Sequence, residues 1–369
     1  MESIGQKVDL WTNEWKELSI KSEIGMWDYF GLRPWILKYT PRYGEVLEAG
    51  CGLGRYNFYL SHFGINICGL DFSEETIDHL NSWQKKNGYN LKFITGDVKN
   101  LPFKDNSLSG YLSFGVIEHF KEGPKEVLDE VYRVLRPGGI AIITTPNKSW
   151  NVKRNVLKRK IKHLIKKVIG IKVISEPFFQ YEYTPDQLKK FMLESNLFPL
   201  EISGGDYLYT FTEYGNFKGN NIHPKSFAYK YSPILDKSFL KKMGAQSISI
   251  STKISENMHC FFCGNKNAHK ESLNKFNVPI CENCIEKEIS NYYLKETPTH
   301  FHDKYLINPK VLKPAKNNCD FCKKEYISNE LFEDFGFNKN ICPDCLTNVE
   351  TNLKLSNENT KPIWRKRKQ

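Results

Sequence analysis

The stretch VLEAGCGLG, residues 46–54, decides the fold, together with GLDFS at residues 69–73. In the first stretch a short apolar run ends at Glu48, and three glycines then alternate with other residues. A segment of helical character follows, and a second apolar run ends at Asp71. Nucleoside cofactors bind to parallel sheets with this layout. The glycines let the backbone turn sharply beside the ligand, and the second acidic residue accepts hydrogen bonds from ribose hydroxyls.

The spacing of the glycines indicates which cofactor to expect. A dinucleotide fingerprint reads G-x-G-x-x-G, and the N-terminus of the following helix holds a pyrophosphate. Here the pattern is E-x-G-x-G-x-G, with only Ala49 between Glu48 and the first glycine. A carboxylate at this position repels phosphates and favours a cationic or amino-acid-bearing ligand.

The first stretch resembles motif I of class I S-adenosylmethionine-dependent methyltransferases, of the type 11 or ubiquinone O-methyltransferase-like kind. Three later stretches agree with this family in order and spacing: FITGDVKNLPF at 93–103, FGVIEHF at 114–120 and VYRVLRPGGIAIITTPN at 131–147. The match covers about residues 30–254. The resemblance implies a Rossmann-like α/β fold with a doubly wound, mostly parallel sheet of seven strands, and methyl transfer from S-adenosylmethionine.

The resemblance also assigns the cofactor contacts. The acidic residue and glycines of the first stretch would hold the methionine part and Asp71 the ribose, while Asp97 and Val98 would contact the adenine. Phe114 and Gly115 would lie where the cleft opens toward the methyl acceptor. The complete expected set is Glu48, Gly50, Cys51, Gly52, Gly54, Asp71, Phe72, Asp97, Val98, Phe114 and Gly115.

Two residues of the FGVIEHF stretch are candidates for the catalytic base. A hydroxyl acceptor needs help in losing its proton near neutral pH, and histidine titrates in that range. His119 is therefore the first candidate and Glu118 the second. The alternative for His119 is a structural role, in which it caps the helix after the fourth strand.

Periodicity and turn residues predict the other elements of a methyltransferase domain at 46–254. Residues 137–139, Pro-Gly-Gly, are expected to form the turn before the fifth strand. Thr184 is expected to be the N-cap of a helix with Pro185 at its first position. The last strand should run antiparallel beside the fifth. The predicted strands are 45–49, 65–70, 91–95, 109–114, 140–145, 199–203 and 246–253.

Two further segments belong to this part of the chain. Residues 1–45 are predicted to form a helical cap, whose tryptophans either line the cofactor cleft or pack on the sheet edge. Residues 148–172 carry ten Lys or Arg and no acidic residue, and predict a basic amphipathic helix. Three roles remain open for this helix: peripheral contact with an anionic membrane, a lid over the substrate cleft, or contact with nucleic acid. Ubiquinone-pathway O-methyltransferases carry a membrane-contacting insertion at a similar place.

Eight of the ten cysteines form C-x-x-C pairs, in two repeats of a pair, a spacer of seventeen or nineteen residues and another pair. Soft thiolates in fours favour two tetrahedral, structural Zn²⁺ ions, paired either sequentially or across the repeats. Disulfides are not expected, because a cytosolic chain is predicted. Cys51 and Cys68 are interpreted as small packing residues. The expected zinc ligands are Cys260, Cys263, Cys281, Cys284, Cys319, Cys322, Cys342 and Cys345.

The cysteine repeats divide the carboxyl-terminal part. The first unit, 256–290, resembles the treble-clef zinc domain at the N-terminus of Clp-type unfoldases, whereas the second, 317–350, resembles zinc fingers in general, since Lys323 follows its first pair. A linker at 291–316 joins the units, and a basic tail at 351–369 follows them. Protein partners and nucleic acid are both open as ligands of these units.

Composition sets the remaining limits. The chain has 369 residues and a formal net charge of +11, which falls but stays positive if eight thiolates bind two zinc ions. No apolar run approaches the length that spans a bilayer, so a cytoplasmic soluble protein is expected, with optional peripheral membrane contact. The favoured function is O-methylation of a small-molecule or lipid-linked acceptor, with zinc fingers that recruit a partner. The alternative is a nucleic-acid or protein methyltransferase, and a non-catalytic scaffold is the third.

Overall fold

The computed structural model describes the chain at Ile20, Glu23, 33–41, 43–61, 64–148, 178–207, Tyr231, 234–235, 238–268, 270–276, 278–286, 316–318, 325–327, 332–334, 339–341 and 364–366. The predicted basic helix at 148–172, apart from Lys148, lies outside these residues. So do most of the predicted N-terminal cap and the second set of four cysteines.

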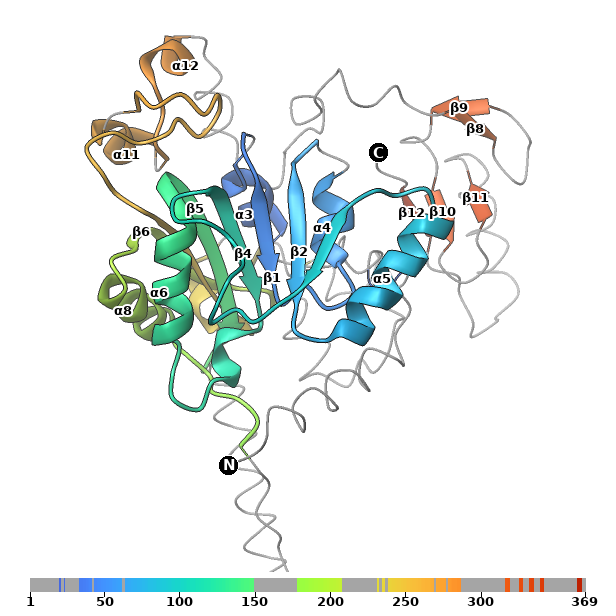
Figure 1. Ribbon diagram of the computed structural model, residues 1–369, viewed down its shortest axis with the longest axis horizontal. Helices are drawn as coiled ribbons and strands as arrows, with labels where there is room; N and C mark the ends of the chain where they lie inside the picture. Colours follow the sequence, from blue (N-terminus) through green and yellow to red (C-terminus); the bar gives the residue numbers. More distant parts are fainter. Residues whose placement is uncertain are drawn as a thin grey trace, which may run out of the picture.

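A seven-stranded sheet forms the centre of the molecule, with strand order β3-β2-β1-β4-β5-β7-β6 (Figure 1). Strands β1 to β5 pair in parallel, and β7 runs antiparallel between β5 and β6. This confirms the predicted doubly wound α/β class. The strands are β1 (Val46–Ala49), β2 (Ile67–Asp71), β3 (Lys92–Thr95), β4 (Leu108–Phe114), β5 (Leu135–Pro146), β6 (Phe198–Gly205) and β7 (Gln246–Thr252).

The predicted turn at 137–139 is wrong, because these residues lie inside β5. Leu108 pairs with Leu135 and Gly110 with Ile140, so β5 carries extra residues at this point and bulges. The bulge requires Gly138, whose φ is +79°, a region that favours glycine. Its N–H donates to the carbonyl of Lys253 at 2.8 Å. This hydrogen bond stabilises a bulge where a turn was predicted.

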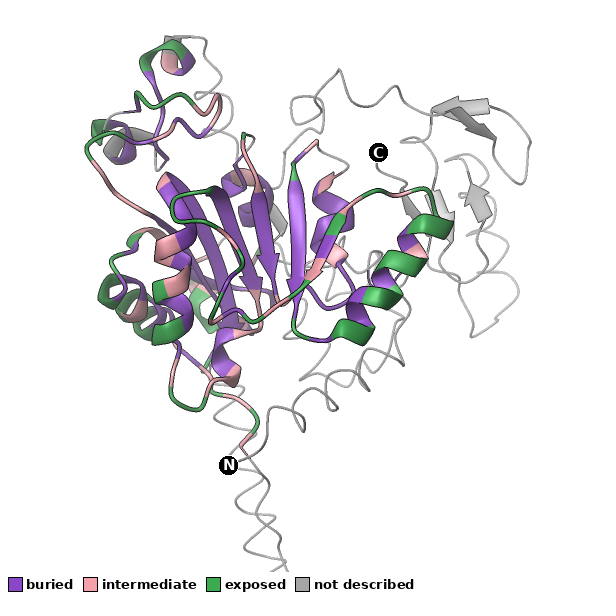
Figure 2. Cartoon of the chain, in the orientation of Figure 1, coloured by how far each residue is buried: buried purple, intermediate pink, exposed green. Residues whose placement is uncertain are grey.

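Alternation along the strands divides the core into two layers. Leu47, Ala141 and Ile143 pack against α6 (Lys125–Val134) and α8 (Pro185–Glu194) on one face. Ile140 and Ile142 lie on the other face, which α3 (Arg33–Tyr39) and α4 (Arg55–Ser61) cover. This period of two is that of strands buried on both faces. Figure 2 shows the result: the central strands are buried and the outer sides of the helices are exposed, whereas β3 at one edge of the sheet is exposed at both of its ends.

Two helices begin at side-chain caps. The predicted start of α8 is confirmed, because Thr184 Oγ1 accepts from the N–H of Gln187 at 3.2 Å and the Gln187 side chain accepts from the N–H of Thr184 at 3.0 Å. Ser73 caps α5 (Glu74–Lys86) in the same manner, accepting from the N–H of Thr76 at 3.2 Å. Such caps satisfy backbone donors that a first helical turn leaves unpaired.

The remaining described elements lie between the strands of this sheet or follow it in the chain. They are the 3₁₀ turns η2 (Ile117–His119) and η3 (Phe239–Met243), the helices α11 (Glu271–Phe276) and α12 (Glu282–Glu286), and the short strands β8 (Lys316–Asn318), β9 (Glu325–Ile327), β10 (Phe332–Asp334), β11 (Lys339–Ile341) and β12 (Trp364–Lys366). Strand β12 of the basic tail pairs antiparallel with β10. Within the described part of the chain, no helix is both long and apolar enough to cross a bilayer.

Candidate functional site

The glycine loop after β1 folds back onto the end of β2. The N–H groups of Gly50 and Cys51 both donate to the carbonyl of Leu70, at 2.8 and 3.0 Å. Gly50 has φ +75°, and a Cβ there would lie 2.4 Å from Cγ2 of Val116. A glycine is therefore required, because the loop after β4 presses directly on this backbone.

Two buried carboxylates stand at the ends of β1 and β2. Asp71 accepts from the N–H of Gly52 at 2.9 Å and from that of Ser73 at 3.1 Å. Glu48 accepts from the N–H of Asn57 at 3.1 Å. Burial raises the pKa of Asp71, and it raises that of Glu48 well above its usual range. A cationic ligand beside them would stabilise their charged forms.

The residues expected at the adenine lie one strand further along the same edge. The N–H of Gly96 donates to the carbonyl of Asp71 at 2.9 Å, which joins the ends of β2 and β3. Asp97 is exposed, and its side chain accepts from the N–H of Lys99 at 2.9 Å, whereas Val98 is buried. Phe72 exposes 39% of its surface beside Asp71 and so presents an open aromatic ring. The structure thus brings the predicted residues of β1 to β3 to one edge of the sheet.

The end of β4 lies at the same edge of the sheet. The N–H of Gly115 donates to the carbonyl of Thr144 at 3.1 Å. The ring of Phe114 lies with its centroid 4.1 Å from that of Tyr56, which the sequence analysis did not select. Tyr56 follows the glycine loop by two residues and is buried. Its position directly after the loop is the signal that could have identified it.

Glu118 is the most unusual titratable group of the site. Its carboxyl group is buried beside Gly115, where a Cβ would lie 3.5 Å from Oε1, and Oε2 has no hydrogen-bond partner among the described residues. Burial raises the pKa of Glu118 to about 8. A carboxyl group in this state can hold or release a proton near neutral pH, as acid–base catalysis requires.

His119 lies at the surface of the same turn. Its Nδ1 atom is 3.0 Å from the carbonyl oxygen of Phe179, and its ring meets that of Phe179 edge-on at 5.1 Å. Because a carbonyl oxygen only accepts, Nδ1 carries the proton in this contact. The segment at 179–183 also crosses the turn through the N–H of Tyr181, which donates to the carbonyl of Glu118 at 2.9 Å. The partner of His119 Nδ1 is therefore the backbone at residue 179 and not the helix after β4, whose N-cap is Pro124.

Asp206 is a second residue that the sequence analysis did not select. It follows β6, is 1% exposed and has φ +65°, a conformation that is rare outside glycine. Its charge and that of Glu48 reach the Tyr56 hydroxyl, although burial is the main cause that raises the pKa of Tyr56. An acidic residue two glycines after a predicted strand is the sequence signal that marks this position.

The N-terminal part of the chain reaches the glycine loop at two described residues. Ile20 is buried against a cluster that includes Cys51 and Leu53. The carboxylate of Glu23 accepts from Nε of Arg55 at 3.0 Å. Trp35, by contrast, packs into the core of the sheet, so for this tryptophan the packing alternative holds.

A hollow of about 430 Å³ lies between α6 and α8, beside the turn that carries Glu118. Its wall is partly aromatic, and the charge of Glu118 acts on one of its residues, Tyr183. No residue of the glycine loop lines it. The hollow is therefore adjacent to the candidate active site and separate from the cofactor positions. Its lining includes Lys121, Lys125, Lys148, Tyr181, Tyr183 and Phe191.

The first four cysteines converge as predicted, and in sequential order. The sulfur atoms of Cys260, Cys263, Cys281 and Cys284 all lie within 4.8 Å of one another, with Cys263 and Cys281 3.6 Å apart. Four sulfurs at about 2.3 Å from a zinc ion lie about 3.8 Å apart in a tetrahedron, so the cluster has the dimensions of a zinc site. A knuckle supports it: the N–H of Gly264 donates to the carbonyl of Cys260 at 2.9 Å.

The sheet order, the glycine loop and the paired acidic residues together form a doubly wound α/β fold with the layout of a nucleoside-cofactor site. Residues 47–143 match the family model described as a methyltransferase domain. A protein named "Probable S-adenosylmethionine-dependent methyltransferase" from Mycolicibacterium smegmatis is 34% identical over 104 residues, which is 28% of this chain and 38% of that protein.

Two further relatives match the same part of the chain. A sterol 24-C-methyltransferase of Pneumocystis carinii is 39% identical over 103 residues, 27% of each chain. A malonyl-[acyl-carrier protein] O-methyltransferase of Pectobacterium atrosepticum is 32% identical over 101 residues, 27% of this chain and 38% of that protein. The chain thus spans between 27 and 38% of the length of these three relatives.

Proposed function

We propose that the protein transfers a methyl group from S-adenosylmethionine. The observation that carries this proposal is the pair of buried carboxylates, Glu48 and Asp71, beside a glycine loop whose N–H groups are already ordered. Their desolvation favours a ligand that brings positive charge, as S-adenosylmethionine does through its ammonium and sulfonium groups. Glu48 would hold the methionine part, Asp71 the ribose, and Phe72 with Val98 the faces of the adenine.

We propose O-methylation of a small-molecule or lipid-linked acceptor as the reaction. Bound S-adenosylmethionine supplies an activated methyl group with a good leaving group, so the chain has to align the acceptor and take up its proton. Glu118, with a pKa near 8, supports a hydroxyl acceptor because its carboxylate could accept that proton. Phe114 and Tyr56 would exclude water from the side where the acceptor enters.

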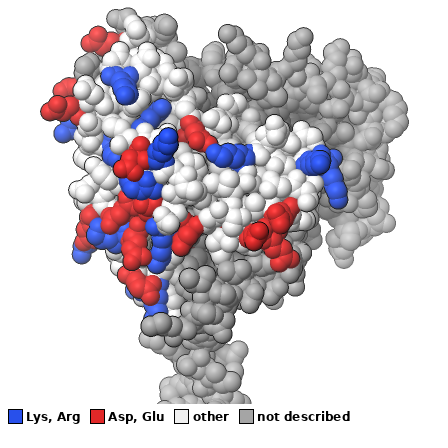
Figure 3. Space-filling model, in the orientation of Figure 1, with Lys and Arg blue, Asp and Glu red and all other residues white. Residues whose placement is uncertain are grey.

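The alternative, a nucleic-acid or protein acceptor, receives no support from the described residues on the face shown in Figure 3. On the face shown in Figure 3, Lys and Arg side chains alternate with Asp and Glu side chains. A polymer of phosphates would favour a continuous basic surface. The ten basic residues of 148–172 lie outside the described residues, apart from Lys148.

The experiment has two stages. Titration calorimetry of the full-length protein with S-adenosylhomocysteine tests the cofactor, and Asp71→Ala should weaken binding. Incubation with S-adenosylmethionine carrying a labelled methyl group then tests the acceptor, against extracted lipids and small metabolites, and separately against protein and nucleic acid. Label in the organic extract supports the proposal. If S-adenosylhomocysteine does not bind, the proposal is overturned. If label appears only in protein or nucleic acid, the acceptor is a polymer and not a small molecule or lipid.

We also propose that the eight cysteines hold two zinc ions, one in each set of four. The described cluster supports the first ion through its dimensions. Elemental analysis of protein purified without chelators should give two zinc ions per chain, and Cys345→Ser should reduce this by one.

Peripheral membrane contact through 148–172 is proposed for the same reaction, since lipid-linked acceptors lie at membranes. Flotation with anionic liposomes should be lost when Arg159, Lys162 and Lys166 are changed to Glu, because their charges would attract the surface. Flotation that survives this change would contradict the proposal.

A further inference from the structure

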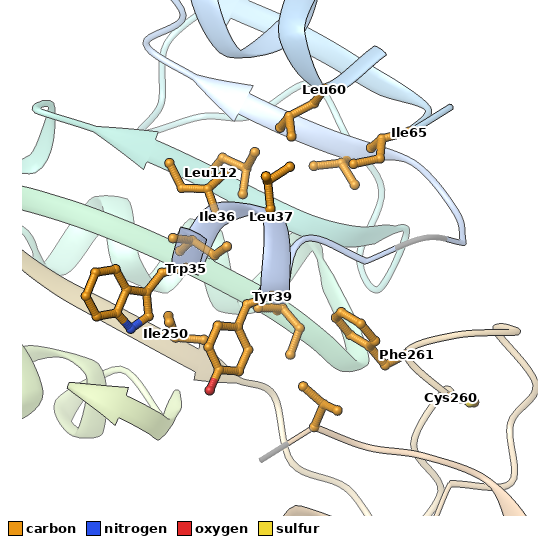
Figure 4. Close-up of a cluster of buried hydrophobic side chains, with 14 of the residues drawn as sticks. Trp35, Ile36, Leu37, Tyr39, Leu60, Ile65, Leu112, Ile250, Cys260 and Phe261 are labelled. Atoms are coloured by element: carbon orange, nitrogen blue, oxygen red, sulfur yellow. The ribbon is translucent and has the colours of Figure 1, made fainter. Parts of the chain in front are cut away.

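The cysteine cluster belongs to the hydrophobic core of the sheet. One continuous set of buried side chains joins residues of α3, β1, β5 and β7 to residues between Met258 and Cys284 (Figure 4). Cys260 and Phe261 lie at one end of this set, and Ile250 and Tyr39 come next in Figure 4. The members contributed by the cysteine unit are Met258, Cys260, Phe261, Ala268, Leu273, Val278, Ile280, Cys281 and Cys284.

The backbone of the cysteine unit is fixed to the bulge in β5. The N–H of His259 donates to the carbonyl of Pro137 at 2.9 Å. A Cβ on Gly138 would lie 2.6 Å from the carbonyl oxygen of His259. The two backbone segments therefore approach too closely for a side chain at position 138. The Pro-Gly-Gly sequence is thus explained by the approach of the cysteine unit as well as by the bulge.

The knuckle of the cluster rests on the chain before β1. A Cβ on Gly264 would lie 1.9 Å from Cδ1 of Tyr43, so the Tyr43 ring covers the glycine that the knuckle needs at φ +76°. The carbonyl of Tyr43 in turn accepts from Nη2 of Arg136 at 3.0 Å. A residue before β1 and a residue at the start of β5 therefore support the same knuckle.

Arg136 supplies positive charge at this place. It is 8% exposed, lies within electrostatic reach of Cys260, and its Nε has no hydrogen-bond partner among the described residues. Four thiolates and one Zn²⁺ carry a net negative charge, and a buried centre of that kind is stabilised by a neighbouring cation. The first residues of β5 thus contribute to the surroundings of the metal centre.

The centre lies far from the methyl-transfer chemistry. Pro137 and Gly138 are at the beginning of β5, whereas Glu48, Asp71 and Gly115 lie at or just after the carboxyl ends of parallel strands. The helices α11 and α12 accordingly lie at the top of the view in Figure 1. A zinc ion here contributes to folding and takes no part in the reaction.

We infer that zinc at Cys260, Cys263, Cys281 and Cys284 is a folding element of the methyltransferase domain, and that Arg136 is its positioning residue. Without the metal, the thiolates repel one another. The apolar side chains of the cysteine unit then no longer pack on the core that they share with β1 and β5. The free energy of zinc binding is then folding free energy of the sheet. This inference rests on the proposed first zinc ion, and it is independent of methyl transfer.

The test compares two single-ligand variants of the full chain, Cys281→Ser and Cys342→Ser. Each should lose one zinc ion. Only Cys281→Ser should speed amide exchange in the peptides that contain β1 and β5, by about tenfold or more, and lower the melting temperature. Equal exchange of these peptides in wild type and in Cys281→Ser that has lost its zinc would overturn the inference.

Two further measurements cover a variant that fails to fold. Graded removal of zinc from wild type with a chelator should speed amide exchange of the β1 and β5 peptides. The increase should follow the loss of the ion held by the cysteines at 260–284. Arg136→Gln should weaken retention of one zinc ion against the same chelator, whereas Arg136→Lys should restore part of it. A wild type that binds no zinc, with exchange insensitive to chelator, would instead refute the zinc site and leave the proposed methyl transfer intact.

Discussion

Asp71 Oδ2 accepts a hydrogen bond from the backbone N–H of Gly52 at 2.9 Å, across 19 positions of the chain. The other oxygen of this carboxylate accepts from the N–H of Ser73 at 3.1 Å. One buried side chain therefore sets the shape of the glycine loop and the start of α5 together. A ribose arriving at Asp71 would meet a loop that is already formed, which reduces the ordering cost of binding.

Asp71→Asn should weaken binding of S-adenosylhomocysteine by about 1–3 kcal/mol, because the amide leaves one of two buried N–H donors without an acceptor. Titration calorimetry measures this loss. Asp78→Asn is the matched control, since Asp78 is exposed on α5 and belongs to none of the expected cofactor contacts. Equal affinities of wild type and Asp71→Asn would show that the carboxylate does not order the site.

Gly50→Ala should destabilise the protein more than Gly88→Ala. The two glycines have nearly equal φ, +75° and +74°, but Gly50 faces Val116 whereas nothing lies within 4 Å of a Cβ at Gly88. The conformational cost alone is about 1 kcal/mol, so any excess at Gly50 reports the clash. Urea unfolding of both variants gives the comparison. Identical losses would mean that the loop after β4 moves freely away.

Glu118→Gln should change how stability depends on pH. The pKa of Glu118 is raised from 4.5 to about 8 by burial, so between these values the folded protein keeps a proton that the unfolded chain has lost. The free energy of unfolding of wild type therefore falls as pH rises through this window and levels off above it. The variant lacks this decline. Denaturant unfolding of both proteins at several pH values measures it, and parallel curves would contradict the assignment.

Glu118→Gln and His119→Asn should separate the two candidate bases. An acid–base group typically contributes about 10²–10⁴-fold, so Glu118→Gln should reduce the rate of methyl transfer by at least about 100-fold. It should also remove the rise in rate as pH increases through about 8. His119→Asn keeps a donor for the Phe179 carbonyl and should retain most activity. The opposite order of effects would make His119 the base.

The sheet was predictable from sequence because its signals are local. Apolar runs, the glycines at 50, 52 and 54, and the Thr184 cap each act within a few residues. All seven predicted strands have counterparts in the sheet, with shifts of one or two residues at their ends, except that β5 begins at Leu135, five residues earlier than predicted. Residues 137–139 were misjudged because a turn and a glycine bulge share the same residues, and contacts with the distant Lys253 and His259 distinguish them.

The site was predictable to a smaller extent. The acidic residues at strand ends were found because their position in the chain fixes their position on the sheet edge. The burial of Glu118 depends on residues 179–183, which cross its turn from another part of the chain. Asp206 and Tyr56 are 150 positions apart in the chain, yet the charge of Asp206 reaches the Tyr56 hydroxyl, and no short-range sequence pattern indicates this proximity.

The order β5-β7-β6 has a consequence for how the chain can be synthesised. Strand β6 ends at Gly205, but the strand that separates it from β5 is β7, which ends only at Thr252. A nascent chain that stops between these points exposes the edge of β5 and has no neighbour for β6. Exposed strand edges promote association with other chains. The sheet is therefore complete only after the ribosome has released β7. The residues from Met258 onward, which share a buried core with β5, follow within a few positions of the end of β7.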